Sequence, residues 1–119
     1  MTEALAHRGP DGYGFFSTEK YEPFPYIGLG HRRLAILDLS ENGKQPMVEG
    51  DLALTFNGEI YNYREIKKEL LDLGYTFKSD SDTEVILKSY LAWGTSGFSK
   101  FRGMFAFGLV DFKAQCLHL

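Results

Sequence analysis

An amphipathic helix pattern that follows directly on a strand-like run constrains this chain most strongly. Between Tyr63 and Leu73 apolar residues recur at helical spacing, which places them on one face of a helix. Asn62 stands where a helix cap is expected, and Gly74 stands where the helix would end. A helix with one apolar face needs another layer to cover it, so the pattern predicts a layered domain. The apolar residues of this face are Tyr63, Ile66, Leu70 and Leu73.

A second helix pattern covers residues 82–93. Ser81 and Glu84 have the spacing of a capping box at its start, and Gly94 follows its last turn. Together with the strand-like runs elsewhere in the chain, the two helices predict a layered α+β domain.

The strands of that sheet are expected where β-branched and aromatic residues gather, in the segments 13–16, 26–39, 52–58 and 103–112. The last of these, GMFAFGLVDF, is too uniformly apolar for a half-exposed strand. We therefore expect both faces of this strand to be covered.

The two ends of the chain read as interrupted elements. Residues 2–8 resemble the tail of a helix that stops at Gly9 and Pro10, with Gly9 in the left-handed conformation. The last residues, 116–119, begin another apolar run. We therefore expect a fragment, cut at both ends, whose isolated fold suffers from uncovered apolar edges.

Composition excludes several classes of function. The formal net charge is -3, with no basic stripe of the kind that nucleic-acid surfaces need. One cysteine, Cys116, cannot form an internal disulfide, which favours a reducing, cytoplasmic location. No apolar run approaches the roughly 18 residues of a membrane span. His7 and His31 have no partner at metal-ligand spacing, so no metal site is predicted.

The loops carry a series of short motifs whose order and spacing resemble one family: HRGPDG, GHRRLAILDLS, QPM, FNGEIYNY, SDTEV and RGMFAF. The series resembles the glutamine-hydrolysing domain of class II glutamine amidotransferases, and in particular that of glutamine-dependent asparagine synthetases. The resemblance covers nearly all of the chain. It implies an incomplete glutamine amidotransferase domain over residues 1–119, with part of the αββα sandwich of amino-terminal-nucleophile hydrolases and without its first strand and its carboxyl-terminal part.

The activity implied by the resemblance is hydrolysis of glutamine, with transfer of the amide nitrogen to aspartate in the full-length enzyme. By the same resemblance Asn57 and Gly58 form the oxyanion hole. An Asn amide and a Gly backbone N–H can converge on one oxygen, as amide hydrolysis requires. A type I′ turn is the structural alternative, because Asn-Gly favours that turn strongly.

The resemblance also implies residues for the α-amino acid end of glutamine. Arg33 would hold the carboxylate with its planar fork, while its neighbour Arg32 is expected to be solvated. Asp82 would hold the ammonium group, with a role as a helix-start carboxylate as the alternative. Glu59 would contact the same end, or be a solvated carboxylate at a strand end. The complete predicted substrate-binding set is Arg33, Leu34, Ala35, Ile36, Leu37, Asn57, Gly58, Glu59 and Asp82.

The family's nucleophile, an amino-terminal cysteine, has no counterpart in this sequence. Cys116 lies in an apolar run near the other end and is expected to be a packing thiol. Thr2 would be an amino-terminal nucleophile if Met1 were removed, but its place on a helix argues against this. We therefore expect the isolated chain to be inactive; a non-catalytic module that binds glutamine or a partner subunit is the alternative.

The remaining predictions concern cofactors and partners. No cofactor is expected in this chain, whereas ATP and magnesium are implied for the synthetase domain. Glutamine and that carboxyl-terminal synthetase domain are the implied partners, and a homodimer is implied for the full-length enzyme.

Overall fold

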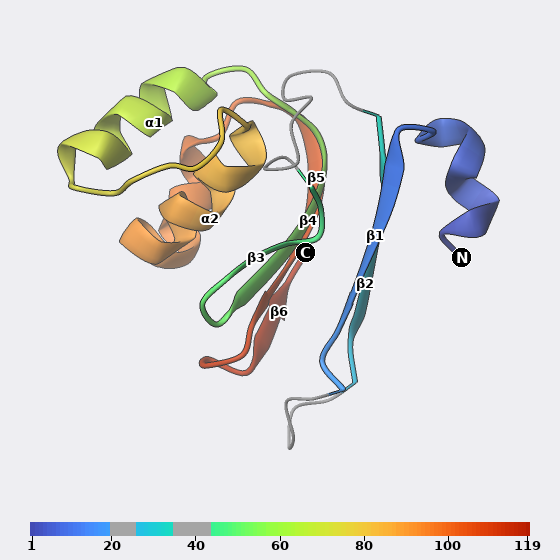
Figure 1. The fold of residues 1–119 in the computed structure, drawn as a ribbon. Helices are drawn as coiled ribbons and strands as arrows, with labels where there is room; N and C mark the ends of the chain where they lie inside the picture. The colour runs from blue at the N-terminus through green and yellow to red at the C-terminus, as the bar shows by residue number, and fades with distance from the viewer. Residues whose placement is uncertain (20–25, 35–43) are drawn as a thin grey trace.

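The computed structural model describes residues 1–19, 26–34 and 44–119 and consists of layers (Figure 1). Helices α1 and α2 cover one face of a four-stranded sheet, and a two-stranded hairpin lies on the other face, with a short helix outside it. The elements are η1 (Glu3–Arg8), β1 (Gly12–Ser17), β2 (Gly28–Arg33), β3 (Met47–Glu49), β4 (Leu52–Ile60), α1 (Tyr63–Asp72), α2 (Asp82–Trp93), η3 (Gly94–Lys100), β5 (Gly103–Asp111) and β6 (Cys116–His118). The predicted α+β class is confirmed.

The four-stranded sheet has the order β3-β4-β5-β6, and all its neighbouring strands are antiparallel. Its long central pair is β4 and β5, in a register that pairs Leu52 with Asp111 and Ile60 with Gly103. Strands β1 and β2 form the separate antiparallel hairpin. β3 pairs only with residues 52–54 of β4, and further along that edge side chains accept from the backbone N–H groups of Phe56 and Ile60.

The main core lies between the four-stranded sheet and the two helices. Alternate residues of β4 point toward the helices, as the period of a strand requires. A smaller cluster joins the sheet to the hairpin through Leu29, Ala53 and Val110, and the Phe16 and Phe112 rings contact each other in a tilted arrangement, with 5.6 Å between their centres. The main core comprises Leu52, Leu54, Phe56, Ile60, Tyr63, Ile66, Leu70, Val85, Ile86, Leu87, Phe101 and Leu109.

Helix α1 has the predicted bounds to within one residue, but its cap differs. Asn62 occupies the N-cap position without a capping hydrogen bond. Its side chain instead accepts from the Arg102 N–H and donates to the Lys100 carbonyl, which ties the helix start to the segment before β5. Gly74 ends the helix with φ +94°, as predicted, whereas Leu73 is 59% exposed and does not belong to the buried face.

Helix α2 begins and ends as the sequence predicts. The Ser81 hydroxyl accepts from the Glu84 N–H, and Gly94 ends the helix with φ +61°. The Glu84 carboxylate binds the N–H groups of Lys78 and Ser79 instead of completing the capping box. Because α2 packs against α1, η3 and the sheet, residues 82–89 are all buried.

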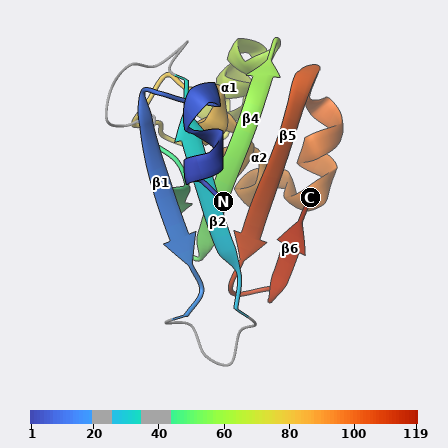
Figure 2. The ribbon, with the colours of Figure 1, turned by 90° about the vertical axis from the view of Figure 1, so that its right-hand side faces the viewer.

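The prediction that β5 is covered on both faces is wrong for its first half. Met104 is 75% exposed and Ala106 is also exposed, whereas Leu109 and Val110 are fully buried. In Figure 2 the β1–β2 hairpin lies over the β4 side of the sheet and leaves much of β5 and β6 uncovered. An apolar strand therefore has an open face where the hairpin ends.

The amino-terminal helix is a 3-10 helix that ends at Gly9, with φ −147° and not the predicted left-handed conformation. Glycine is required there for another reason, since a Cβ would lie 2.6 Å from the Arg32 backbone. In the part of the chain that the structure describes, no helix has the length and apolarity to cross a membrane.

Candidate functional site

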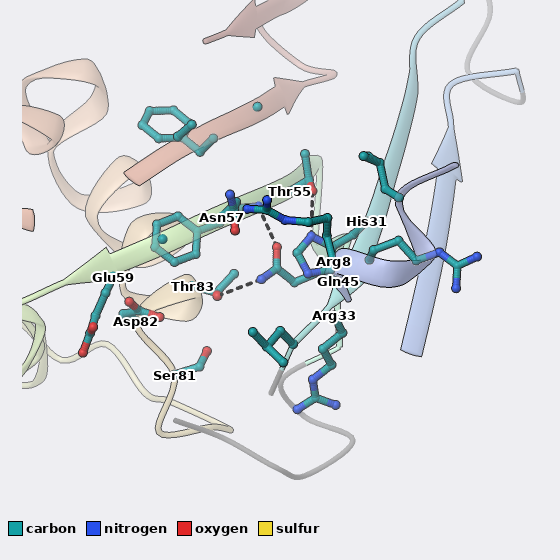
Figure 3. Close-up of a pocket in the computed structure, with 18 of the residues that line it drawn as sticks. Arg8, His31, Arg33, Gln45, Thr55, Asn57, Glu59, Ser81, Asp82 and Thr83 are labelled. Atoms are coloured by element: carbon teal, nitrogen blue, oxygen red, sulfur yellow. Dashed lines mark hydrogen bonds between the residues drawn. The ribbon is translucent and has the colours of Figure 1, made fainter. Parts of the chain in front are cut away.

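A cavity of about 1040 Å³ lies between the β1–β2 hairpin, strands β4 and β5, and the start of α2 (Figure 3). It is larger than most small-molecule sites need, since these usually have about 300–1,000 Å³. Of the predicted substrate-binding residues, Ala35, Ile36 and Leu37 lie outside the described residues. All the others line this cavity: Arg33, Leu34, Asn57, Gly58, Glu59 and Asp82.

The two-residue period of a strand places the polar side chains of β4 on the face toward the cavity. Leu52, Leu54 and Phe56 point into the helix-side core, so the residues between them point the other way. The cavity face of β4 thus presents Thr55, Asn57 and Glu59, opposite Gly108, Ala106 and Met104 of β5. Two of the three residues opposite are small, which leaves room for a ligand over Asn57.

Asn57 and Gly58 do not form a hairpin turn. They lie inside β4, paired with Ala106 and Phe105, so the type I′ turn is excluded. Gly58 has φ +129°, and a Cβ there would overlap the Met104 carbonyl oxygen. Glycine is therefore required both by the backbone angle and by the close approach of β5.

The backbone N–H groups of β4 alternate between its two edges. The Tyr61 N–H donates to the Arg102 carbonyl at 2.7 Å, so the odd-numbered N–H groups of this strand point toward β5. The even-numbered ones point to the other edge. There the Phe56 N–H donates to Gln45 Oε1 at 2.6 Å, and the Ile60 N–H donates to Asp82 Oδ2 at 3.0 Å. Gly58 lies midway between them, so its N–H is directed to the same edge, beside the cavity.

Gln45 is a site residue that sequence reasoning missed. Its Oε1 holds the Phe56 N–H, and its Nε2 donates to Thr83 Oγ1 at 3.3 Å, so it joins β4 to the start of α2 (Figure 3). Gly14 of β1 makes its position possible, because a Cβ there would overlap the Gln45 carbonyl. The motif QPM contained this residue, but neither partner is near it in sequence.

Asp82 combines its two predicted roles. It is the first residue of α2 and only 5% exposed, and it lines the cavity. Burial raises the pKa of the Asp82 carboxyl, the backbone N–H of Ile60 and other hydrogen bonds oppose that rise, and the Glu59 charge adds to it. A ligand cation would relieve the cost of two carboxylates on this side of the cavity.

The opposite side of the cavity is basic. His31 of β2 lies 3.3 Å from Thr55 Oγ1 through its Nδ1 and so links the hairpin to β4. Burial lowers the pKa of His31, and the charge of Arg33 lowers it further. In Figure 3 the Arg33 side chain extends away from Asn57, so the residues predicted to bind the carboxylate and the amide lie at different parts of the cavity.

Arg32 is not simply solvated, contrary to the prediction. Its Nε donates to the Thr2 carbonyl at 2.8 Å, and its guanidinium lies 5.3 Å from the centre of the Tyr13 ring. It therefore fastens η1 to the hairpin. The loop after η1 is joined to the hairpin as well, since the Asp11 N–H donates to the Arg33 carbonyl at 3.0 Å.

Neither Cys116 nor Thr2 lines the cavity. Cys116 lies on β6, where its sulfur contacts His118. Thr2 is the residue before η1, and its carbonyl binds Arg32. The described part of the site therefore offers hydrogen-bond donors and charged groups, and it offers no thiol.

The sequence is similar to those of several curated proteins. The chain is 49% identical over 109 residues to glutamine-hydrolyzing asparagine synthetase 1 of Bacillus subtilis, covering 90% of this chain and 16% of that protein. It is 41% identical over 131 residues to putative glutamine-hydrolyzing asparagine synthetase 2 of Methanocaldococcus jannaschii, covering 95% of this chain and 24% of that protein. The chain thus spans less than a quarter of either relative.

The fold has a match among solved structures. Glutamine phosphoribosylpyrophosphate amidotransferase from Bacillus subtilis, complexed with ADP and GMP, superposes with a TM-score of 0.76 over 93% of this chain and 31% of that chain, at 22% identity. A family model described as a glutamine amidotransferase domain matches residues 1–119. On this match and on the asparagine synthetases as relatives, the chain belongs to the class II glutamine amidotransferase domain family.

Proposed function

We propose that the cavity binds glutamine and belongs to the ammonia-supplying domain of an asparagine synthetase, in which the amide nitrogen passes to aspartate. The observation that carries this proposal is the edge of β4 beyond β3, where Gln45 accepts from the Phe56 N–H and Asp82 accepts from the Ile60 N–H, on either side of Gly58. The Gly58 N–H and the Asn57 side chain then form two converging donors beside one cavity.

Two such donors suit the chemistry of amide cleavage. Attack on the glutamine amide carbonyl places negative charge on its oxygen, and donors fixed in advance stabilise that charge without rearrangement. The pairing of β4 with β5 fixes Asn57, while Gln45 and Asp82 fix the backbone around Gly58. These residues are therefore oxyanion donors and supports in this proposal, and none of them is the nucleophile.

The α-amino acid end of glutamine carries both charges, and the cavity offers a complementary group for each. Arg33 can hold the carboxylate through its planar fork. Asp82 and Glu59 favour a cation beside them, which suits the ammonium group. The separation of Arg33 from Asn57 in Figure 3 fits a substrate whose amide and carboxylate lie at opposite ends.

The nucleophile in this proposal is a cysteine that is not among these 119 residues. The sequence has one cysteine, Cys116, and it lies outside the cavity. The chain alone would then recognise glutamine without hydrolysing it. Transfer to aspartate, with ATP and magnesium, would belong to a synthetase domain, and a cytoplasmic location and a homodimer stay predictions.

The test compares this chain with an extended protein in which the flanking segments of the Bacillus subtilis synthetase are joined to both ends. Ammonia release from glutamine is measured for each. The extended protein should release ammonia and the chain alone should not. In the extended protein, Asn57→Ala should lower turnover by about 100- to 1000-fold, with a smaller effect on apparent binding, because the donor acts mainly in the transition state.

If the turnover of the Asn57→Ala protein lies within a few-fold of that of the unchanged protein, Asn57 is not an oxyanion donor. Ammonia release by the chain alone would require a nucleophile that we have not identified, and Thr2→Ala and Cys116→Ala variants would locate it. If even the extended protein binds glutamine without hydrolysing it, the non-catalytic binding module replaces the present proposal.

A further inference from the structure

The side of β5 that faces the cavity changes from a large residue to small ones along the strand. Met104, Ala106 and Gly108 line the cavity, whereas Phe105 and Phe107 between them pack against the helix-side core. The cavity floor is therefore lowest beside the last two of the three lining residues.

Ala106 lies directly beside Asn57, because the two residues are paired in the register of β4 and β5. The Tyr61 N–H donates to the Arg102 carbonyl, an even number of pairs further along, so the Asn57–Ala106 pair is also of the hydrogen-bonded type. Side chains of such a pair stand on the same face of the sheet, with Cβ atoms about 4.5–5.5 Å apart. A longer side chain at position 106 would therefore enter the space next to the Asn57 amide.

The packing of the fold does not explain a small residue at position 106. Ala106 is exposed in the interior of β5, a nine-residue strand. Such positions favour β-branched and larger side chains over alanine. Gly58, by contrast, is required by its backbone angle and by the close approach of β5. The small side chain of Ala106 is thus explained better by the cavity than by packing.

We propose that Ala106 is a specificity-determining residue, whose small side chain leaves the room in which the carboxamide end of glutamine lies against Asn57. The inference rests on the proposed function, since it assigns one part of the same cavity to the amide. The groups assigned to the α-amino acid end, Arg33 and Asp82, belong to β2 and α2. A larger residue at position 106 should therefore block the amide end and leave the α-amino acid end in place.

The experiment titrates L-glutamine by calorimetry into the unchanged chain and into Ala106→Ser, Ala106→Val and Ala106→Leu. Affinity should fall in that order, by about tenfold or more for leucine, because each larger side chain takes more of the space beside Asn57. Ala114→Leu is the matched control. It adds the same bulk at an exposed position of the β5–β6 turn, outside the cavity, and should leave the affinity unchanged.

Titration with L-alanine separates a local block from a distorted site, since this ligand has the α-amino and α-carboxyl groups and no amide. Its weak binding, followed by NMR, should be the same for the unchanged chain and Ala106→Leu. Urea unfolding should show Ala106→Val and Ala106→Leu to be no less stable than the unchanged chain. A marked loss of stability in both would mean that the fold requires alanine, and would overturn the inference.

Two further results would overturn the inference and leave the proposed function standing. One is a glutamine affinity that stays the same across the three Ala106 variants. The other is an equal loss of affinity for glutamine and L-alanine. If the unchanged chain does not bind glutamine, the proposed recognition by this cavity fails, and the inference fails with it.

Discussion

Gly58 is constrained by its backbone angle, by the neighbouring strand and by its place beside the cavity. Its φ of +129° disfavours any side chain, and the Met104 carbonyl of β5 occupies the space that a Cβ would need. The same residue presents its N–H beside the cavity. Glycine in the interior of a strand normally lowers stability. Here it is required by the backbone angle and by the close approach of β5.

Gly58→Ala should therefore destabilise the fold more than an alanine at another left-handed glycine. Gly50, with φ +56° and no atom near its Cβ position, is the matched control. Gly50→Ala should lower the free energy of unfolding by about 1–3 kcal/mol through strain alone. Urea unfolding of both variants measures the difference. Equal losses would mean that β5 relaxes away from the added methyl group without cost.

Asp82→Asn should stabilise the folded chain at pH 7 while weakening glutamine binding. Burial raises the pKa of Asp82, so the folded state binds this proton more tightly than the unfolded state does. The stability from the protonated form is fully present below the ordinary Asp range near pH 4 and is lost as the pH rises through the raised pKa. Asparagine carries no charge, so it does not lose this stability at neutral pH, and its side-chain oxygen can still accept from the Ile60 N–H.

Urea unfolding of both proteins across pH checks this sign. The advantage of Asp82→Asn should be largest at neutral pH and should shrink as the pH falls toward 4. An Asn variant that is less stable than the original at pH 7 would mean that the ionised carboxylate stabilises the native state.

Arg33→Lys and Arg32→Lys should separate recognition from structure. A lysine at position 33 keeps the charge and loses the planar fork, so glutamine affinity should fall about tenfold, equivalent to roughly 1.4 kcal/mol. Arg32→Lys should weaken the contacts to Thr2 and Tyr13, and so lower stability slightly without changing affinity. Calorimetric titration of the extended protein measures both; interchangeable effects on affinity would contradict the assignment of Arg33.

At the scale of elements, the site depends on how β4 is joined to the start of α2. Gln45 binds the Phe56 N–H and the Thr83 hydroxyl, and Asp82 binds the Ile60 N–H. These bonds take the place of a neighbouring strand along an edge that β3 covers only as far as Leu54. The edge is thus anchored at two points, on either side of the Gly58 N–H.

Gln45→Ala should remove one anchor. It leaves the N–H of buried Phe56 without its acceptor, which should cost about 1–3 kcal/mol of folding free energy. Gln45→Glu keeps an oxygen for Phe56 and loses the donor to Thr83, so it should be less destabilising. Urea unfolding measures both, and a fully stable Gln45→Ala chain would mean that water replaces the side chain.

The elements that the sequence predicted well are those specified by local signals. Ser81 and Gly94 bound α2 through contacts within a turn of their own positions. Asn62 was predicted as a cap and instead binds residues near β5, because a long-range partner competes with the local one. The motifs indicated the lining residues Asn57 and Asp82, but periodicity alone did not reveal the open face of β5 or the bridge made by Gln45.

On the scale of the whole molecule, the cavity exists because the hairpin covers only part of the sheet (Figure 2). In one part of this contact, Leu29 of the hairpin packs against Ala53 and Val110 of the sheet. Beyond that contact, His31 and Thr55 link the two sheets at the cavity wall. The interface between the hairpin and the four-stranded sheet is therefore apolar in one part and polar where it lines the cavity.

The most direct measurement is a crystal structure of the extended protein, with its nucleophile disabled, in complex with L-glutamine. The amide oxygen should lie within hydrogen-bonding distance of the Asn57 side chain and the Gly58 N–H, about 2.7–3.2 Å. The carboxylate should contact Arg33, and the ammonium group should contact Asp82. Glutamine bound elsewhere, or bound in this cavity with its amide turned away from Asn57 and Gly58, would contradict the account.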